Sequence, residues 1–254
     1  MVYETIWLHQ ERNVCLERYQ LAHTELVANV KQRPAVLILP GGGYQNHAER
    51  EAEPVAMAYL AKGYNAFILR YSVAEYAIWP NPLNDAEDAL RLIRKNAAIW
   101  QVDPEKICTV GFSAGGHLSI AVSSMGAERP NAQIVGYPVV NAETVKIMPV
   151  HNFPELTSAI DRNTAPTFVF ATMEDELVPV ENSIQLIAAL SRAGVESEIH
   201  IFQRGCHGAC LATPHDSSGL PRFVHPEVAV WFEMSMTFLR SLFGDFPQTR
   251  TELL

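Results

Sequence analysis

Cysteine and basic residues are both scarce in this sequence of 254 residues, and each shortage excludes a class of function. The four cysteines form no CxxC pair and have no histidine at a zinc-binding spacing, so we expect no metal site and a reduced, cytoplasmic protein. Lysine and arginine number 19 against 28 aspartate and glutamate residues, a formal charge of -9. A surface of this sign repels polyanions, so nucleic-acid binding is not expected.

Targeting, membrane and boundary signals are missing as well. Residues 1–5 place no basic segment ahead of an apolar core, which argues against a secretory signal. The longest stretch without Asp, Glu, Lys or Arg, residues 107–127, has Gly, Ser and His in its middle and reads as strand, turn and buried helix. No linker, charge block, low-complexity stretch or internal repeat divides the chain. We therefore expect one domain over residues 1–254 and no membrane partner.

Strand-like and helix-like patterns alternate from residue 34 onward. Two extended segments, 5–9 and 14–22, flank a polar turn before that point and predict an antiparallel pair. Further strands are expected at residues 35–39, 66–71, 107–112, 133–139, 167–172 and 198–202, and helices at 49–61, 85–100, 114–124, 183–193 and 226–243. This order predicts an α/β fold with a mostly parallel sheet of about eight strands flanked by helices.

The strongest motif is G-x-S-x-G at residues 111–115, with Ser113 at its centre. An apolar strand precedes it and a small-residue helix follows, which is the context of a nucleophile elbow. A serine in so tight a turn needs small neighbours, and Gly111, Ala114 and Gly115 supply them. The helix dipole favours negative charge at this position, so Ser113 is the candidate nucleophile.

A glycine triplet follows the strand at residues 35–39, in the segment Pro40-Gly41-Gly42-Gly43-Tyr44. Because catalytic groups of such sheets lie beyond the carboxyl ends of the strands, this loop is expected near Ser113. The N–H groups of Gly42, Gly43 and Ala114 are the candidates for an oxyanion hole. A phosphate-binding loop is less favoured, since no Lys-Ser/Thr pair follows and the glycines lack G-x-G-x-x-G spacing.

Three carboxylates follow the strand at residues 167–172 and compete for the acid role. Asp175 is preferred because it lies at the strand exit, before Leu177-Val178-Pro179. A neighbour in sequence generally points elsewhere, so Glu174 and Glu176 are expected to be solvated surface charges.

Histidine follows the last strand within Gly205-Cys206-His207-Gly208. A loop histidine between glycines is seldom a core residue, so His207 is the candidate base. His117 in a helix and His200 in a strand are expected to be packed or structural. His215 and His225 remain alternatives.

The resulting chain order, Ser113, Asp175, His207, is that of α/β-hydrolases. With its segments at residues 40–44, 111–118, 175–179 and 206–208, the sequence resembles the compact microbial acetyl esterase and acetylxylan esterase-like group of that superfamily. The resemblance implies a carboxylic ester hydrolase, often removing acetyl groups from sugars, without metal or organic cofactor. Pro40 stands where the hormone-sensitive-lipase group has histidine, and no helical cap precedes it, which argues against long acyl substrates.

The expected partner is a small-molecule ester, and assembly into a homo-oligomer stays open. Other chemistry of the same fold, such as peptide, thioester or formamide cleavage, uses the same three side chains and stays an alternative. A non-catalytic binding module is disfavoured because no member of the triad is missing. A scaffold protein is disfavoured because it would need repeats or an exposed apolar face.

Overall fold

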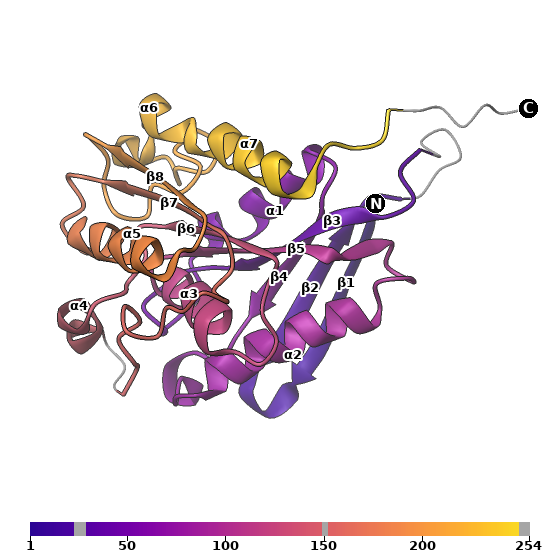
Figure 1. Ribbon diagram of the computed structural model, residues 1–254, viewed down its shortest axis with the longest axis horizontal. Helices are drawn as coiled ribbons and strands as arrows, with labels where there is room; N and C mark the ends of the chain where they lie inside the picture. The colour runs from indigo at the N-terminus through magenta and orange to yellow at the C-terminus, as the bar shows by residue number, and fades with distance from the viewer. Residues whose placement is uncertain (23–28, 149–151, 249–254) are drawn as a thin grey trace, which may run out of the picture.

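An eight-stranded sheet runs through the centre of the protein (Figure 1). The structure is a computed structural model that describes residues 1–22, 29–148 and 152–248. The strands, in sheet order, are β1 (Val2–His9), β2 (Val14–Gln20), β4 (Asn65–Arg70), β3 (Arg33–Leu39), β5 (Val102–Phe112), β6 (Ala132–Gly136), β7 (Thr167–Thr172) and β8 (Ser197–Phe202). β2 pairs antiparallel with β1 and β4, and all other pairs are parallel. The expected mostly parallel sheet is confirmed.

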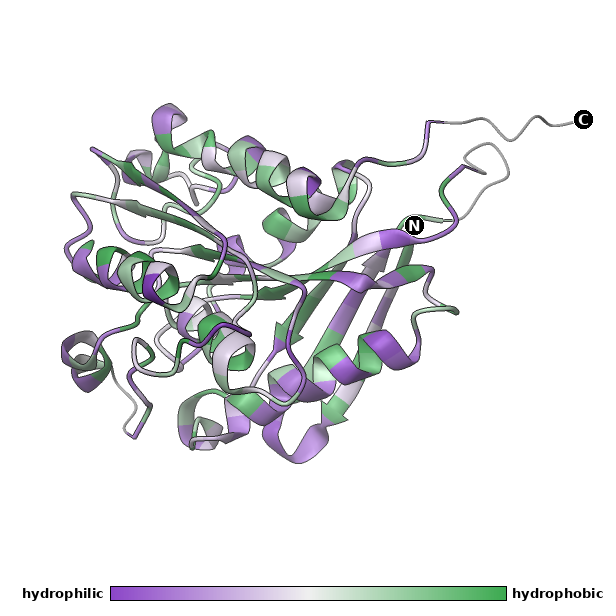
Figure 2. Cartoon of the chain, viewed as in Figure 1, coloured by the Kyte–Doolittle hydropathy of each residue, from purple (hydrophilic) through white to green (hydrophobic). Residues whose placement is uncertain are grey.

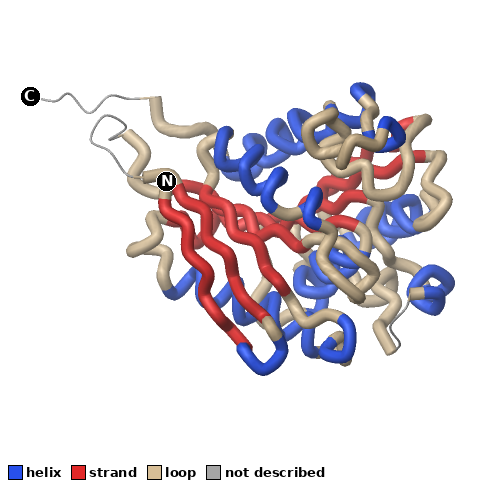
Figure 3. Tube along the Cα trace, turned by 180° about the vertical axis from the view of Figure 1, so that it is seen from behind, coloured by secondary structure: helices blue, strands red, loops and turns tan. Residues whose placement is uncertain are grey.

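Alternating side chains of the central strands build two apolar cores. On β3, Leu37 and Leu39 belong to one core and Val36 and Ile38 to the other, since successive side chains of a strand point to opposite faces. The helices are α1 (Glu53–Ala61), α2 (Asn81–Lys95), α3 (Ala114–Met125), α4 (Ala142–Ile147), α5 (Glu181–Ala193), α6 (Pro226–Ala229) and α7 (Trp231–Phe243). Figures 1 and 3 show helices on both faces of the sheet. The first core includes side chains of α2, α3 and α5, and the second includes side chains of α1 and α7.

Among the helices that lie on the sheet, α2, α5 and α7 are amphipathic, whereas α1 and α3 are apolar around most of their circumference. Figure 2 shows apolar colour along the central strands and a mixture of apolar and polar turns on α2. Ala86, Ala89, Leu90 and Ile93 form the buried face of α2, as their spacing predicts. Residues 114–124 of α3 are buried all round. Within the described part of the chain, no helix has both the length and the apolar character needed to cross a bilayer.

Several element boundaries differ from the sequence-based expectations. β5 begins at Val102 instead of residue 107, β6 ends at Gly136 instead of residue 139, α2 ends at Lys95 instead of residue 100, and the helix expected at 226–243 divides into α6 and α7. α2 begins at Asn81 instead of residue 85, because Pro82 fits the first turn of a helix. The helix expected at residues 49–61 divides into a 3₁₀ turn, Glu49–Glu51, and α1. The short helix α4 was not predicted, although the Asn141 side chain caps it by accepting a hydrogen bond from Thr144 N at 2.9 Å.

Four loops meet at one edge of the sheet. β3, β5, β7 and β8 run parallel to one another, so their carboxyl ends lie on the same side. The glycine loop, the elbow and the loops that carry Asp175 and His207 follow these four strand ends. The topology therefore gathers every predicted site residue at one edge.

Candidate active site

Ser113 occupies a strained turn between β5 and α3. Its φ of 53° and ψ of −118° lie outside the regions that non-glycine residues usually adopt. The turn is held by hydrogen bonds from Ser113 N to the Gly136 carbonyl, at 3.0 Å, and from His117 N to the Ser113 carbonyl, at 3.0 Å. Gly115 is required here, because a Cβ at this position would collide with the Leu39 carbonyl. The elbow thus presses against the end of β3, where the glycine loop starts.

Ser113, His207 and Asp175 form one line of hydrogen bonds. Ser113 Oγ lies 2.9 Å from His207 Nε2, and His207 Nδ1 lies 2.7 Å from Asp175 Oδ2. With the proton on Nδ1, the imidazole donates to the carboxylate and accepts from the serine hydroxyl. The structure brings all three predicted residues together in the order that the chemistry requires.

Asp175 is almost completely buried and its second oxygen is also satisfied. The exposed fraction of its side chain is 1%, against 16% for His207. Oδ1 accepts hydrogen bonds from Leu177 N at 2.9 Å and Val178 N at 2.8 Å. These bonds orient the carboxylate, so that Oδ2 is directed at the imidazole.

The competing acids and histidines lie elsewhere. Glu174 and Glu176 are exposed, as expected. His215 is exposed and contacts a threonine hydroxyl at 3.0 Å, and His225 Nε2 donates to a backbone carbonyl at 2.7 Å. None of these four makes a hydrogen bond to Ser113 among the described residues.

His117 is a packed residue of the core. Its Nδ1 lies 2.9 Å from the Tyr44 hydroxyl, and its Nε2 lies 2.9 Å from the Pro154 carbonyl. Burial lowers the pKa of His117 to about 4, because an apolar environment disfavours the charged imidazolium. The side chain is therefore neutral at neutral pH and acts as a structural link.

The glycine loop is held in place by hydrogen bonds to its backbone carbonyl groups. The Tyr71 hydroxyl donates to the Pro40 carbonyl, and Ala48 N donates to the Gly41 carbonyl at 3.0 Å. Gln45 N donates to the Gly42 carbonyl at 3.0 Å. Gly42 has a φ of 122°, a conformation that only glycine adopts without strain.

The amide groups of the loop remain available. Across the described residues, no hydrogen-bond partner is found for the N–H groups of Gly42, Gly43 and Ala114. All three residues line the same pocket as Ser113 and His207. This is the arrangement that an oxyanion hole needs, since unpaired donors must face the position of the developing charge.

The pocket over Ser113 has a volume of about 530 Å³. That volume lies within the range of roughly 300–1,000 Å³ typical of small-molecule sites. Apart from the residues already named, it is lined by Asn46, Ala48, Arg50, Glu51, Val139, Thr144, Met148, Leu177, Val178 and Gly208. Much of the wall is apolar. Among the described residues that line the pocket, Arg50 is the basic one.

Glu51 and Tyr137 are site residues that the sequence analysis did not single out. Glu51 is 2% exposed and accepts hydrogen bonds from Gly41 N at 2.7 Å and from the Tyr137 hydroxyl at 2.8 Å. Burial raises the pKa of its carboxyl, and the two hydrogen bonds act in the opposite direction. The sequence signal that could have indicated Glu51 was an acidic residue shortly after the glycine loop in the chain, just before an apolar helix.

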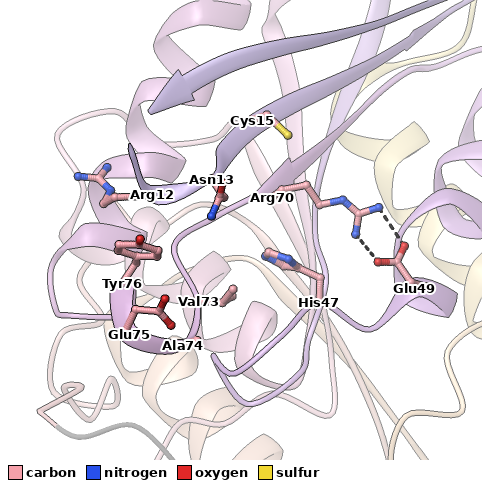
Figure 4. A pocket seen from close by; sticks show the side chains of 10 residues that line it. All are labelled: Arg12, Asn13, Cys15, His47, Glu49, Arg70, Val73, Ala74, Glu75 and Tyr76. Atoms are coloured by element: carbon pink, nitrogen blue, oxygen red, sulfur yellow. Dashed lines mark hydrogen bonds and ion pairs between the residues drawn. The ribbon is translucent and has the colours of Figure 1, made fainter. Parts of the chain in front are cut away.

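A second pocket lies on the other side of segment 46–51 (Figure 4). It measures about 290 Å³ and is lined by Arg12, His47, Glu49 and Arg70, among others. Its arginines are neutralised, because Arg70 pairs with Glu49 at 2.9 Å and Arg12 pairs with Asp85. It contains no predicted catalytic residue. Over the described ranges, no group of three or more His, Cys, Asp or Glu side chains is arranged to hold a metal ion.

A comparison with known protein families places the sequence in one of them. The BD-FAE family model matches residues 26–153, half of the chain, including the glycine loop and the elbow. This chain belongs to the BD-FAE family. The relatives described next include an acetylxylan esterase and an acetyl ester hydrolase, and they confirm the expected resemblance to acetyl esterases and acetylxylan esterases of the α/β-hydrolase superfamily.

Two solved hydrolase structures resemble this chain over nearly its whole length. MGS-M1, an α/β-hydrolase from a Medee basin deep-sea metagenome library, is 42% identical, with a TM-score of 0.90 over 95% of this chain and 98% of its own. An acetyl ester-xyloside bifunctional hydrolase from Caldicellulosiruptor lactoaceticus is 31% identical, with a TM-score of 0.79 over 95% of this chain and 97% of its own.

An acetylxylan esterase from Xylanibacter ruminicola is 30% identical over 200 residues, which are 70% of this chain and 42% of that protein. The BD-FAE chain spans less than half the length of the curated relatives it matches.

Proposed function

We propose that this BD-FAE protein is a serine carboxylic ester hydrolase that removes short acyl groups, acetyl above all, from alcohols that include sugars. The observation that carries the proposal is the line from Ser113 Oγ through His207 to Asp175, with unpaired amides beside it. These are the parts that acyl transfer requires: a nucleophile, a base, an orienting acid and donors for an oxyanion.

In the first half of the reaction, Ser113 Oγ attacks the ester carbonyl carbon as His207 Nε2 takes its proton. The negative charge moves to the carbonyl oxygen, where the N–H groups of Gly42, Gly43 and Ala114 stabilise it. The tetrahedral intermediate collapses when the imidazolium returns the proton to the alcohol oxygen. The alcohol leaves, and the acyl group stays on Ser113.

In the second half, His207 removes a proton from water, which attacks the acyl carbon. The carboxylic acid leaves and Ser113 recovers its hydrogen. Asp175 keeps the imidazole in one tautomer and stabilises its cation in both halves. Every proton moves through one side chain, so the scheme needs no cofactor.

The choice of a short acyl group rests on the pocket and on the relatives. Val139, Met148, Leu177 and Val178 give one pocket an apolar wall, and that pocket must hold the acyl group and part of the alcohol together. Two of the relatives carry acetyl esters in their names, one of them an acetylxylan esterase. Both points support an acetyl group and a sugar-sized alcohol.

A substrate panel tests this proposal against other chemistry of the same fold. The panel holds p-nitrophenyl acetate, an acetylated xylo-oligosaccharide, a dipeptide amide and an acyl thioester, each compared by kcat/KM. The proposal expects both acetate esters to be hydrolysed and the amide to be cleaved far more slowly. Preferential cleavage of the amide or of the thioester would assign the triad to a different reaction.

A further inference from the structure

Glu51 lies behind the glycine loop and connects it to the loop that carries His207. On one side, its Oε2 accepts the N–H of Gly41, the residue directly before the amides expected to bind the oxyanion. On the other side, its Oε1 accepts the Tyr137 hydroxyl, which itself accepts a hydrogen bond from Cys210 N at 3.2 Å. Cys210 follows His207 by three residues.

The Tyr137 ring also packs directly on the candidate base. Its centroid lies 4.9 Å from that of the His207 imidazole, in an edge-on arrangement with an interplanar angle of 65°. One buried carboxylate is therefore connected to the oxyanion loop by one bond and to the support of the histidine by the other.

We propose that Glu51 is a positioning residue for catalysis, which sets the oxyanion loop through Gly41 and couples it to the histidine loop through Tyr137. The inference rests on the proposed function, since it assigns a role within that reaction. Glu51 acts through these neighbours and is not itself required to touch the substrate.

A carboxylate suits this position because both of its neighbours donate. An ionised carboxylate is an acceptor at each oxygen, whereas an amide has one acceptor and one donor end. Glutamine at position 51 would turn its NH₂ group toward either Gly41 N–H or the Tyr137 hydroxyl. A donor facing the Gly41 N–H would leave a buried backbone group unpaired, which is costly.

Gly41 packs closely against the turn that carries Ser113. A Cβ built on Gly41 would lie 3.0 Å from Ser113 Cβ and 2.8 Å from the Phe112 carbonyl oxygen, so the loop rests on the elbow itself. Gly42 and Gly43 follow immediately. Because misplacement of a catalytic group by about 1 Å can cost on the order of a hundredfold in rate, small shifts here matter.

The same turn provides a matched control. Glu49 stands two residues earlier in the 3₁₀ turn Glu49–Glu51, but its side chain faces the other pocket, where it pairs with Arg70 (Figure 4). Glu49→Gln removes the same charge without touching the glycine loop. Asp85→Asn provides a second control, because Asp85 is a fully buried acid that accepts a hydrogen bond from Ser72 N, outside the catalytic pocket.

The experiment measures kcat and KM for p-nitrophenyl acetate and the inhibition constant of a trifluoromethyl ketone, whose adduct imitates the oxyanion. For Glu51→Gln we expect kcat to fall roughly 10- to 100-fold with KM within about twofold, and the inhibitor to bind weaker by a similar factor. Glu49→Gln and Asp85→Asn are expected to keep both values within about twofold. If Glu51→Gln does not fold, Tyr137→Phe carries the test, with kcat and inhibitor affinity both lowered severalfold.

Unchanged kcat and inhibitor affinity in folded Glu51→Gln, or a loss equal to that of Asp85→Asn, would overturn the inference. Ser113→Ala separates this failure from failure of the proposed function. If Ser113→Ala is inactive and Glu51→Gln is fully active, the result contradicts the role of Glu51 and leaves the proposed function intact. A Ser113→Ala variant that keeps its activity removes the triad reaction and the inference with it.

Discussion

Ser113 Oγ and His207 Nε2 lie 2.9 Å apart, although the two residues are 94 positions apart in the chain. Three parallel strands, β5, β7 and β8, end at the same edge and bring Ser113, Asp175 and His207 within hydrogen-bond range. The rest of the proposed reaction depends on this one geometric relationship.

The first prediction follows from treating these side chains as one unit. Ser113→Ala and His207→Ala should each lower kcat by about a millionfold, and the double variant should lose little more. Asp175→Asn should lose about ten-thousandfold, because the amide favours the wrong imidazole tautomer. Steady-state kinetics with p-nitrophenyl acetate measures all four. Normal activity in Asp175→Asn, together with an inactive Glu174→Gln or Glu176→Gln, would show that the acid is misassigned.

The second prediction concerns acyl length. Each methylene buried in a suitable trough contributes about 0.8 kcal/mol, so an enzyme with a long trough improves steadily with chain length. The pocket has a volume of about 530 Å³, which the acyl group and part of the alcohol must share. Its apolar wall is formed by Val139, Met148, Leu177 and Val178. We expect kcat/KM to be highest for p-nitrophenyl acetate and to fall through butyrate, octanoate and palmitate. A maximum at octanoate or palmitate would contradict the short-acyl proposal.

The third prediction concerns stability at acidic pH. Burial lowers the pKa of His117 from 6.5 to about 4, so the folded state binds this proton less readily than the unfolded chain. The burial of neutral His117 therefore contributes to the free energy of unfolding in full above pH 6.5. This contribution is lost as the pH falls from 6.5 toward 4. The difference amounts to about 3 kcal/mol.

Urea unfolding of wild type and His117→Gln between pH 4 and 8 measures the effect. The variant should be less stable at neutral pH and should show a shallower decline on acidification. His47, whose pKa burial also lowers to about 4, should account for part of the remaining slope. Parallel curves for the two proteins would exclude His117 as a source of the acid sensitivity.

The fourth prediction concerns metals. The proposed reaction passes each proton through His207 and places the charge on backbone amides, so no step requires a metal ion. Prolonged treatment with EDTA, followed by removal of the chelator, should leave kcat/KM for p-nitrophenyl acetate unchanged. Loss of activity that zinc restores would require a different mechanism.

The sequence predicted the parts of the fold that short-range patterns encode. The central strands are continuous apolar runs, and the elbow is marked by glycines that no other residue can replace, so the sheet and the position of Ser113 could both be inferred. Asp175 and His207 could be proposed because each follows a strand directly. Their catalytic roles remain predictions that the experiments above address.

The remaining features depend on contacts between distant segments. The bond between Glu51 and Tyr137 joins residues 86 positions apart, and neither residue type marks a site by itself. The helix α4 has six residues and depends on one capping side chain, Asn141, so its periodicity is too short to detect. The start of α2 was missed because Pro82 was not recognised as part of the first helical turn.

Covalent labelling of the nucleophile tests the central claim most directly. Diethyl p-nitrophenyl phosphate transfers its phosphoryl group to an activated serine with loss of p-nitrophenolate, and peptide mass spectrometry locates the product. The proposed triad predicts one diethylphosphoryl group on Ser113, loss of esterase activity in proportion to labelling, and much slower labelling of His207→Ala. Labelling at another residue, or a Ser113→Ala variant that is labelled and inactivated at the wild-type rate, would contradict the assignment of Ser113 as the nucleophile.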